Sequence, residues 1–428
     1  MDFPIREQFA KYPSNRFVAP KLRIVRKSMP TDVMIPAAYD GREQALIKHV
    51  LLKSYLEKLF HIIGMNKSPG SAELCYVDCF AGPWGDKSDG MESTSIAISL
   101  RVLASCKQTL EKLGINATIR ALYVEQDATA FGRLTTYLES ETPEGILATP
   151  LRGDFVKLRE DIVRWAGSDA FTFFFIDPKG WKDVGVGVLR PLLQRPKSEF
   201  LINFMYDFVN RTMSMESWQD EMIALLGEAI NLDGLEPGLR EGEILTTYCK
   251  NLKDCFPTAS NARFRARAAH VRVMDPTKAR PKYHLVYLTS HPKGVVEFME
   301  VSEHVDLVQK KVRAQKQVSA REMRSGMADM FGQKSYINEG AGHASALDVD
   351  RFWIEYLGNG VKSIATAEFA DMLETTGWFP GDLQASLNRL IAEKKVVNLD
   401  SSSRRPKKPL HFERKGERLV LSEHAPPN

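Results

Sequence analysis

Two short apolar runs, each ended by an aspartate, constrain the fold of this chain more than any other feature. Residues 74–85 read LCYVDCFAGPWG, and residues 171–181 read FTFFFIDPKGW. Each run stops at an aspartate, Asp78 or Asp177, and residues rich in glycine and proline follow. This pattern is typical of buried parallel strands, and ligands of open α/β sheets bind in the crevice outside the carboxyl ends of such strands. The two runs therefore predict two loops of one site.

The segments around these runs alternate between strand and helix patterns. Helical spacing of apolar residues predicts a helix over 42–64, and further strands are expected at 119–124 and 200–204. Two later strands, 264–274 and 283–289, are separated by a turn signal at 275–277. We therefore expect an α/β domain with a Rossmann-like, mostly parallel sheet covered by helices.

The last part of the chain predicts a second, smaller domain. Residues 345–421 read as helix, helix, turn, helix and then two strands around a loop that contains SSSRRPKK. That order matches a winged helix-turn-helix, with the basic loop as its wing. The predicted organisation has five parts: a basic arm (1–40), the α/β domain (41–300), a helical linker (301–344), the winged helix-turn-helix (345–421) and a tail (422–428).

Composition limits the class of protein. The chain has 428 residues and a net charge of +4, and its longest apolar stretch falls far short of the ~20 residues of a membrane span. Its first residues lack the apolar core of a signal peptide, so we expect a cytoplasmic protein that does not enter the membrane. The five cysteines form no C-x-x-C pair, so neither a disulfide framework nor a metal site is expected.

The first motif predicts a cofactor loop. It matches neither G-x-G-x-x-G nor the P-loop pattern, so a dinucleotide or a nucleoside triphosphate is not favoured. Its acid, Asp78, suits an ammonium group, and Gly82 and Gly85 let backbone N–H groups approach a ligand closely. Phe80 and Ala81 complete this loop.

The next strand ends supply two more acids. Glu125 stands where doubly wound sheets place an acid on ribose hydroxyls, and Asp154 is placed for an adenine amino group, with Phe155 beside it to stack. Each acid alone is more simply explained as an ordinary loop residue. Ribose, adenine and a charged amino acid in this order describe S-adenosylmethionine, which is the predicted cofactor.

The second motif predicts an acceptor loop. Asp177, Pro178 and Gly180 resemble the D-P-P-[YF] box of methyltransferases that act on exocyclic base amines. In that box the carboxylate and the following backbone carbonyl hold the amino group, and an aromatic residue stacks on the flipped base. Here the aromatic residue is Trp181, one position late, and it either stacks on a base or packs on the sheet.

Longer stretches resemble one family. The order of Asp78, Glu125, Asp154 and Asp177 looks like a class I S-adenosylmethionine-dependent methyltransferase. A closer resemblance is to the three-Cys-motif partner family (TcmP). It rests on Lys48-His49 with Tyr55-Leu56, the FAGP loop, the FIDPKGW motif and YHLVYLTSHPKG at 283–294. The resemblance covers about residues 45–300. It implies a sheet that ends in an antiparallel hairpin, and a bacterial partner protein with three clustered cysteines like those of radical enzymes.

Basic residues suggest a nucleic-acid partner. Residues 250–282 hold nine Lys/Arg against two Asp, and residues 400–415 hold six against two acids. If Arg263, Arg265 and Arg267 lie on a strand they share one face, and like charges in register call for a nearby anion. The wing adds four more candidate phosphate ligands: Arg404, Arg405, Lys407 and Lys408.

Together these features favour a methyltransferase that acts on nucleic acid, either DNA or RNA, at an exocyclic amine of a base. Two alternatives stay open: a cofactor-binding partner subunit without catalysis, and a DNA-binding regulator whose α/β domain senses a small molecule. For the winged helix, the alternative to nucleic-acid binding is protein contact, which is a common use of that fold.

Overall fold

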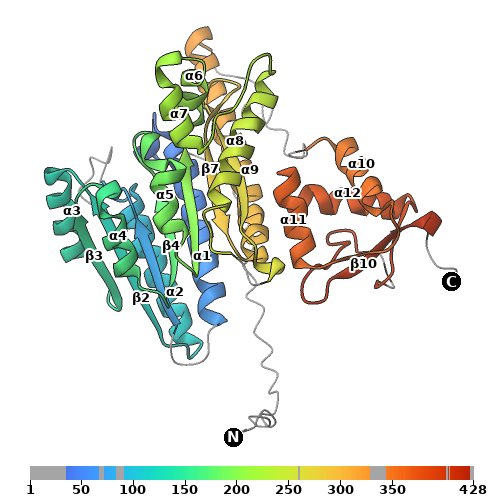
Figure 1. Cartoon of the computed structure of the whole chain (residues 1–428), viewed down its shortest axis with the longest axis horizontal. Coiled ribbons are helices and arrows are strands. Elements are labelled where there is room, and N and C mark those ends of the chain that lie inside the picture. The colour runs from blue at the N-terminus through green and yellow to red at the C-terminus, as the bar shows by residue number, and fades with distance from the viewer. Residues whose placement is uncertain are drawn as a thin grey trace, which may run out of the picture.

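A seven-stranded sheet forms the centre of the larger part of the molecule (Figure 1). The structure is a computed structural model and describes residues 35–66, 72–82, 91–258, 261–327, 344–401, 403 and 405–424. The sheet is formed by β1 (Ala72–Asp78), β2 (Ala117–Glu125), β3 (Ile146–Arg152), β4 (Phe171–Ile176), β5 (Ser198–Phe204), β6 (Arg267–Met274) and β7 (Pro281–Thr289).

The strand order is β3-β2-β1-β4-β5-β7-β6, with β7 antiparallel to both β5 and β6 and the other neighbours parallel. This is the Rossmann-like, mostly parallel α/β sheet with a final antiparallel hairpin that the sequence predicted. The chain reverses its direction of travel across the sheet between β1 and β4, which is where such sheets bind ligands. Asp78 is the last residue of β1, and Asp177 directly follows β4.

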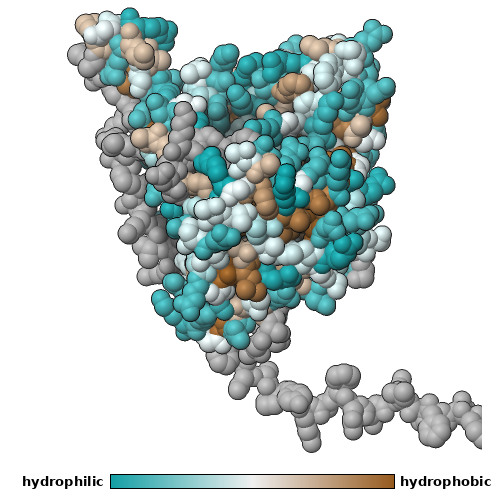
Figure 2. All heavy atoms as spheres, turned by 90° about the vertical axis from the view of Figure 1, so that its left-hand side faces the viewer, coloured by the Kyte–Doolittle hydropathy of each residue, from teal (hydrophilic) through white to brown (hydrophobic). Residues whose placement is uncertain are grey.

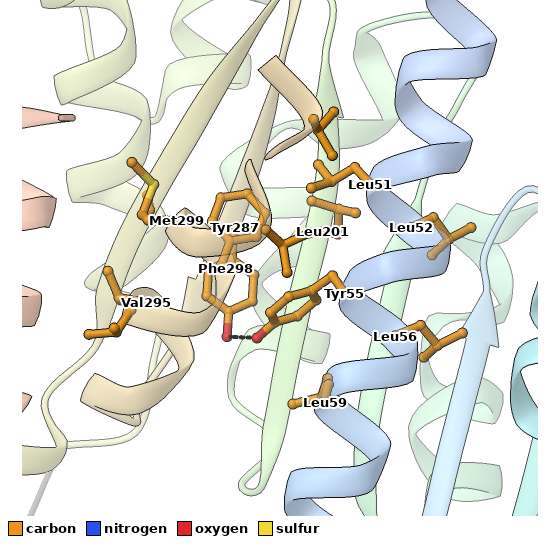
Figure 3. Packing of buried hydrophobic residues seen from close by; sticks show 14 of the residues in the cluster. Leu51, Leu52, Tyr55, Leu56, Leu59, Leu201, Tyr287, Val295, Phe298 and Met299 are labelled. Atoms are coloured by element: carbon orange, nitrogen blue, oxygen red, sulfur yellow. Dashed lines mark hydrogen bonds between the residues drawn. The ribbon is translucent and has the colours of Figure 1, made fainter. Parts of the chain in front are cut away.

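Helices cover both faces of the sheet. The larger-domain helices are α1 (Glu43–Met65), α2 (Ser95–Lys112), α3 (Ala128–Glu141), α4 (Phe155–Ala166), α5 (Val186–Leu193), α6 (Tyr206–Thr212), α7 (Gln219–Leu226), α8 (Pro237–Lys253) and α9 (Pro292–Ser325). One hydrophobic cluster packs α1, α2, α3 and α9 against one face, and another packs α4 to α8 against the other. In Figure 3, Leu51 and Tyr55 of α1 face Leu201 and Tyr287 of the sheet and Phe298 of α9.

The surface at the β3 edge of the sheet is mostly hydrophilic, with apolar residues gathered in small areas (Figure 2). Leu147 of the edge strand is among the exposed apolar side chains. Among the described residues, no helix is long and apolar enough to cross a membrane.

Helix α9 crosses the boundary predicted at residue 300. Its later turns bury Val305, Val308 and Val312 in the same cluster as α1, so the helix continues the α/β domain and no separate linker begins at residue 301. Residues 328–343 of the predicted linker and residues 1–34 of the predicted arm lie outside the described residues.

The smaller C-terminal part contains α10 (Ala346–Leu357), β8 (Lys362–Ile364), α11 (Thr366–Thr376), α12 (Pro380–Ala392), β9 (Val396–Asn398) and β10 (Glu417–Leu421). Its strands form an antiparallel sheet in the order β8-β10-β9. Of the two strands that the sequence predicted, at 396–397 and 410–412, β9 confirms the first, whereas the second prediction is wrong because residues 410–412 form no strand and β10 follows at 417–421. Helices α11 and α12 pack on α9, α10 packs on α12, and all three share the hydrophobic cluster of α9.

Candidate functional site

The carboxyl ends of β1, β2 and β4 meet around one cavity of about 110 Å³. Six predicted site residues line it: Phe80, Glu125, Asp154, Phe155, Asp177 and Gly180. Their positions follow from the topology, because parallel neighbouring strands bring their following loops to one edge. A second cavity, of about 180 Å³ between α5, α7 and α8, contains none of the predicted residues.

Asp78 lies beside this cavity but does not line it. Its side chain has no exposed surface, and Ser95 Oγ donates to its Oδ2 at 2.6 Å while the Phe80 N–H donates to its Oδ1 at 3.2 Å. Burial raises the pKa of Asp78 to about 7, and the charge of Asp177 also acts to raise it. The prediction that Asp78 meets an ammonium group directly is therefore wrong for this conformation. Asp78 instead ties the loop after β1 to the start of α2.

Of the other predicted residues in the loop after β1, some line the cavity and others do not. Phe80 lies against Phe155, with ring centroids 4.9 Å apart, and both line the cavity. Ala81 is buried, and its N–H donates to the Val124 carbonyl of β2 at 2.8 Å, which fixes the loop to the sheet. Gly82 ends this described segment outside the cavity, and Gly85 lies outside the described residues.

Glu125 and Asp154 each use one oxygen to shape their own loop. The Asp127 N–H donates to Glu125 Oε1 at 2.6 Å, and the Lys157 N–H donates to Asp154 Oδ1 at 3.0 Å, where Asp154 caps α4. Within the part of the chain that the structure describes, the second oxygen of each carboxylate has no hydrogen-bond partner and can accept one. The cavity wall between them thus combines two carboxylates with the Phe80–Phe155 pair.

Asp177 is held from two sides. Lys48 Nζ, from α1, lies 2.5 Å from its Oδ2, and Asn203 Nδ2, from β5, donates to its Oδ1 at 2.7 Å. The side chains of Lys48 and Asp177 are only 13% and 19% exposed, so the pair is largely shielded from solvent. Neither Lys48 nor Asn203 was predicted as a site residue. Lys48 is on a helix far away in sequence, and Asn203 is a single polar residue inside an apolar strand run.

Trp181 packs into the protein. It is 6% exposed, stacks on Phe208 at 5.7 Å and meets Trp218 edge-on. Of the two interpretations of this ring, packing is correct, and Trp181 is not available to stack on a base.

Asp183 lines the cavity although the sequence did not predict it as a site residue. It lies in the short helix η2 (Lys182–Val184), two residues after Trp181. Burial raises the pKa of Asp183, and the nearby Asp154 adds to this effect.

The arginines around 265 are paired within the chain. Only Arg267 of the three belongs to β6, and its side chain is 1% exposed. Arg265 and Arg267 both donate to Asp371 Oδ1 of α11 at 2.8 Å, and Arg265 also lies 2.9 Å from Glu374. The predicted nucleic-acid surface is therefore wrong for Arg267, which is buried, whereas Arg265 is ion-paired but 42% exposed and its role stays a prediction. The anion that these like charges require is a pair of carboxylates of the chain itself.

Arg263 lies in the 3-10 helix η4 (Ala262–Phe264) rather than on a strand, so the predicted alternation on one face is absent. In the basic loop of the C-terminal part, Arg405 donates to both oxygens of Glu417, at 2.7 and 2.6 Å. Lys407 and Lys408 are exposed, and Arg404 lies outside the described residues. The two lysines remain the candidates there.

No protein-family model matches this chain, and no curated protein matches it. Solved structures that align with part of this chain include several that are described as methyltransferases. They include a putative O-methyltransferase from Klebsiella pneumoniae (10% identity, 60% of this chain and 92% of that one, TM-score 0.31). An O-methyltransferase from Bacillus cereus in complex with SAH has 10% identity over 61% and 84%, with a TM-score of 0.29. The O-methyltransferase TomG from Streptomyces achromogenes in complex with SAM has 10% identity over 60% and 92%, with a TM-score of 0.30.

Proposed function

We propose that this protein is an S-adenosylmethionine-dependent methyltransferase that acts on nucleic acid, at an exocyclic amine of a base. The observation that carries the proposal is the convergence of Glu125, Asp154, Phe155 and Asp177 on one cavity at the strand ends. The strand order also agrees with it, because the cavity lies beside the point where the order reverses.

The residues present fit the cofactor. One Glu125 oxygen would accept hydrogen bonds from ribose hydroxyls, and one Asp154 oxygen would accept from the adenine amine, since each acid has an oxygen outside its loop contact. Phe80 and Phe155 supply apolar surface for the adenine ring. The cavity is smaller than the ~300–1,000 Å³ of typical ligand pockets, so it accommodates part of such a molecule.

The bound cofactor would supply an electrophilic methyl group, and the chain would position the acceptor. Asp177, held by Lys48 and Asn203, would accept a hydrogen bond from the amine, with the Pro178 carbonyl next to it. That arrangement acts through orientation and fixed dipoles rather than through a covalent intermediate.

A rival function is a cofactor-binding subunit without catalysis. The burial of Trp181 favours it, because the chain then lacks the aromatic ring that D-P-P-[YF] enzymes stack on a flipped base. A three-Cys-motif protein would be the partner of such a subunit, as the family resemblance implies.

The C-terminal part is proposed to be a winged helix that docks nucleic acid through Lys407 and Lys408. Its helix and strand order and its exposed basic loop support this role.

The test of the proposed function is transfer of a radiolabelled methyl group from S-adenosylmethionine to total RNA and to genomic DNA. We expect transfer by the wild-type protein and a loss of at least about tenfold in Asp177→Asn, which removes the charge that Lys48 balances. Asp220→Asn, an exposed acid on α7, is the matched control and should retain full transfer. Cofactor binding without any transfer would favour the non-catalytic subunit.

A further inference from the structure

Asn203 places a bare hydrogen-bond acceptor beside Asp177. It is the penultimate residue of β5 and is 3% exposed. Its Nδ2 donates to Asp177 Oδ1 at 2.7 Å and contacts Met205 Sδ at 3.8 Å. Its Oδ1 is buried and has no hydrogen-bond partner among the described residues. The amide is thus satisfied on its donor side only.

The orientation of this amide is fixed by its neighbour. An ionised carboxylate can only accept hydrogen bonds, so the NH2 group of Asn203 must face Asp177 and the carbonyl oxygen must be the bare atom. Turning the amide over would bring two acceptors together. Buried polar atoms nearly always have a partner, because leaving one unpaired costs free energy, so such an exception beside a candidate reactive carboxylate indicates a site.

Lys48 decides what kind of group suits this position. Its ammonium lies 2.5 Å from Asp177 Oδ2, so the pair carries no net charge and offers little attraction to a cationic acceptor. Each carboxylate oxygen has taken one donor and can accept another. The oxygens of Asp177 and Asn203 Oδ1 are therefore hydrogen-bond acceptors beside an ion pair that has no net charge.

We propose that Asn203 Oδ1 is a specificity-determining acceptor, which together with Asp177 receives two N–H groups of an uncharged amino group on the substrate. This inference rests on the proposed function and deepens it, since it selects amine over hydroxyl or carbonyl at the acceptor atom. A carbonyl in that place would set acceptor against acceptor, and a hydroxyl would leave one acceptor unpaired, which is the arrangement that enzymes use to reject analogues. Asn203 does not itself line the cavity, so a neighbouring side chain has to move to admit the group. Met205, whose flexible side chain contacts Nδ2 of this amide, can make that movement.

The test is the binding of nucleosides to the full chain saturated with S-adenosylhomocysteine, measured by calorimetry. The probes are pairs that differ at the amine: cytidine against uridine, and adenosine and guanosine against inosine. For at least one pair, the wild-type protein is expected to bind the amine-bearing member about tenfold more tightly or better, which corresponds to one unpaired buried group.

Two variants locate the effect. Asn203→Leu removes the acceptor at similar size, and the preference for the amine should fall to within about twofold. Asn251→Ala, an amide on α8 that donates to the Leu226 carbonyl, is the control and should behave as wild type. Each variant is first shown to bind S-adenosylhomocysteine as tightly as the wild type.

The outcomes separate the two proposals. Failure of the wild-type protein to bind S-adenosylhomocysteine contradicts the proposed function. If the cofactor product binds while no nucleoside binds, or while each pair binds equally, the inference about Asn203 is wrong and the cofactor site stands. It is also wrong if Asn203→Leu keeps the wild-type preference.

Discussion

At the scale of single residues, the acids at the strand ends have different roles although the sequence presents them alike. Asp78 and Asp177 both end an apolar run, but Asp78 is fully buried and satisfied by Ser95 and the Phe80 N–H, whereas Asp177 lines the cavity. The difference comes from the partners, which lie on other elements. Burial of an acid also has a consequence for stability.

We expect Asp78→Asn to stabilise the protein at neutral pH. Burial raises the pKa of Asp78 from 3.8 to about 7, so between these pH values the folded state keeps a proton that the unfolded state loses. The wild-type free energy of unfolding thus loses a contribution as the pH rises from about 4 to about 7, and the amide avoids this loss. The gain should reach a few kcal/mol, since each pKa unit is worth about 1.4 kcal/mol.

The measurement is urea unfolding of both proteins at pH 5, 6, 7 and 8. The difference in free energy of unfolding should grow up to about pH 7 and then level. Asp220→Asn is the control for an exposed acid. A difference that is independent of pH would contradict the assigned pKa.

Gly294 shows why one residue of the 283–294 motif has to be glycine. A Cβ atom there would lie 2.5 Å from the Tyr287 hydroxyl and 3.0 Å from Glu199 Oε1. Tyr287 and Thr289 donate to this buried Glu199, and Tyr55 donates to Tyr287 (Figure 3). The backbone of α9 closes over this polar network.

Gly294→Ala should therefore destabilise the protein by about 1–3 kcal/mol, the usual result of overpacking. Thermal unfolding measures the change. Gly187→Ala, in α5 with no neighbouring atom within 4 Å of its added Cβ, is the matched control and should not lower the melting temperature. Equal effects of the two substitutions would argue against close packing at Gly294.

At the scale of elements, the sequence predicts what is local. The strand 171–176 and the helix over 42–64 follow from the spacing of apolar residues, and both are found within a residue or two as β4 and α1. The start of α2 is local in the same sense, because Thr94 precedes the helix and its side chain accepts from the Ala97 N–H. These features depend on neighbours in the chain.

Contacts between distant elements could not be predicted in this way. Arg265 and Asp371 are 106 residues apart, and the sequence gives no sign that α11 lies on β6. The role of Lys48 at the site was not predicted for the same reason, because it contacts Asp177 from a position 129 residues earlier in the chain. A basic cluster alone therefore cannot distinguish a phosphate site from an internal ion-pair network.

Asp371→Asn should weaken the docking of α11 on β6. Arg267 is 1% exposed and would lose its carboxylate partner, although it keeps hydrogen bonds to the Arg263 and Arg265 carbonyls. A loss of about 1–3 kcal/mol in the free energy of unfolding is expected. Asp348→Asn, which breaks an exposed pair with Arg351 on α10, should change it by less than about 1 kcal/mol. Urea unfolding of both variants measures the two changes. Equal small changes would contradict a stabilising role of the pair between Arg267 and Asp371.

At the scale of the whole molecule, the candidate site and the candidate nucleic-acid surface lie on different parts. The cavity belongs to the α/β sheet, and Lys407 and Lys408 belong to the loop before β10. Arg265 and Arg267, near β6, and Arg405, in this loop, are all engaged by carboxylates of the chain. Within the described part of the loop, Lys407 and Lys408 are the predicted basic residues that stay exposed. The proposed function requires both parts.

Lys407→Ala/Lys408→Ala should weaken binding of the full chain to nucleic acid. Each lysine that contacts a phosphate contributes close to one unit to the slope of log affinity against log salt, so the double variant should lower that slope by up to about 2. Lys112→Ala, an exposed lysine at the end of α2, should leave the slope unchanged. Fluorescence anisotropy with labelled RNA and DNA at several salt concentrations measures it. An unchanged slope in the double variant would favour the use of this part for protein contact.

The central claim is that the strand ends around Glu125 and Asp154 bind S-adenosylmethionine, and calorimetric titration of the full chain with that molecule tests it most directly. We predict a saturable heat with one site per chain, and an affinity lowered about tenfold in Glu125→Gln, whose amide cannot accept the ribose hydrogen bonds as strongly. No heat of binding from the wild-type protein, or equal affinity of the two proteins, would contradict the account.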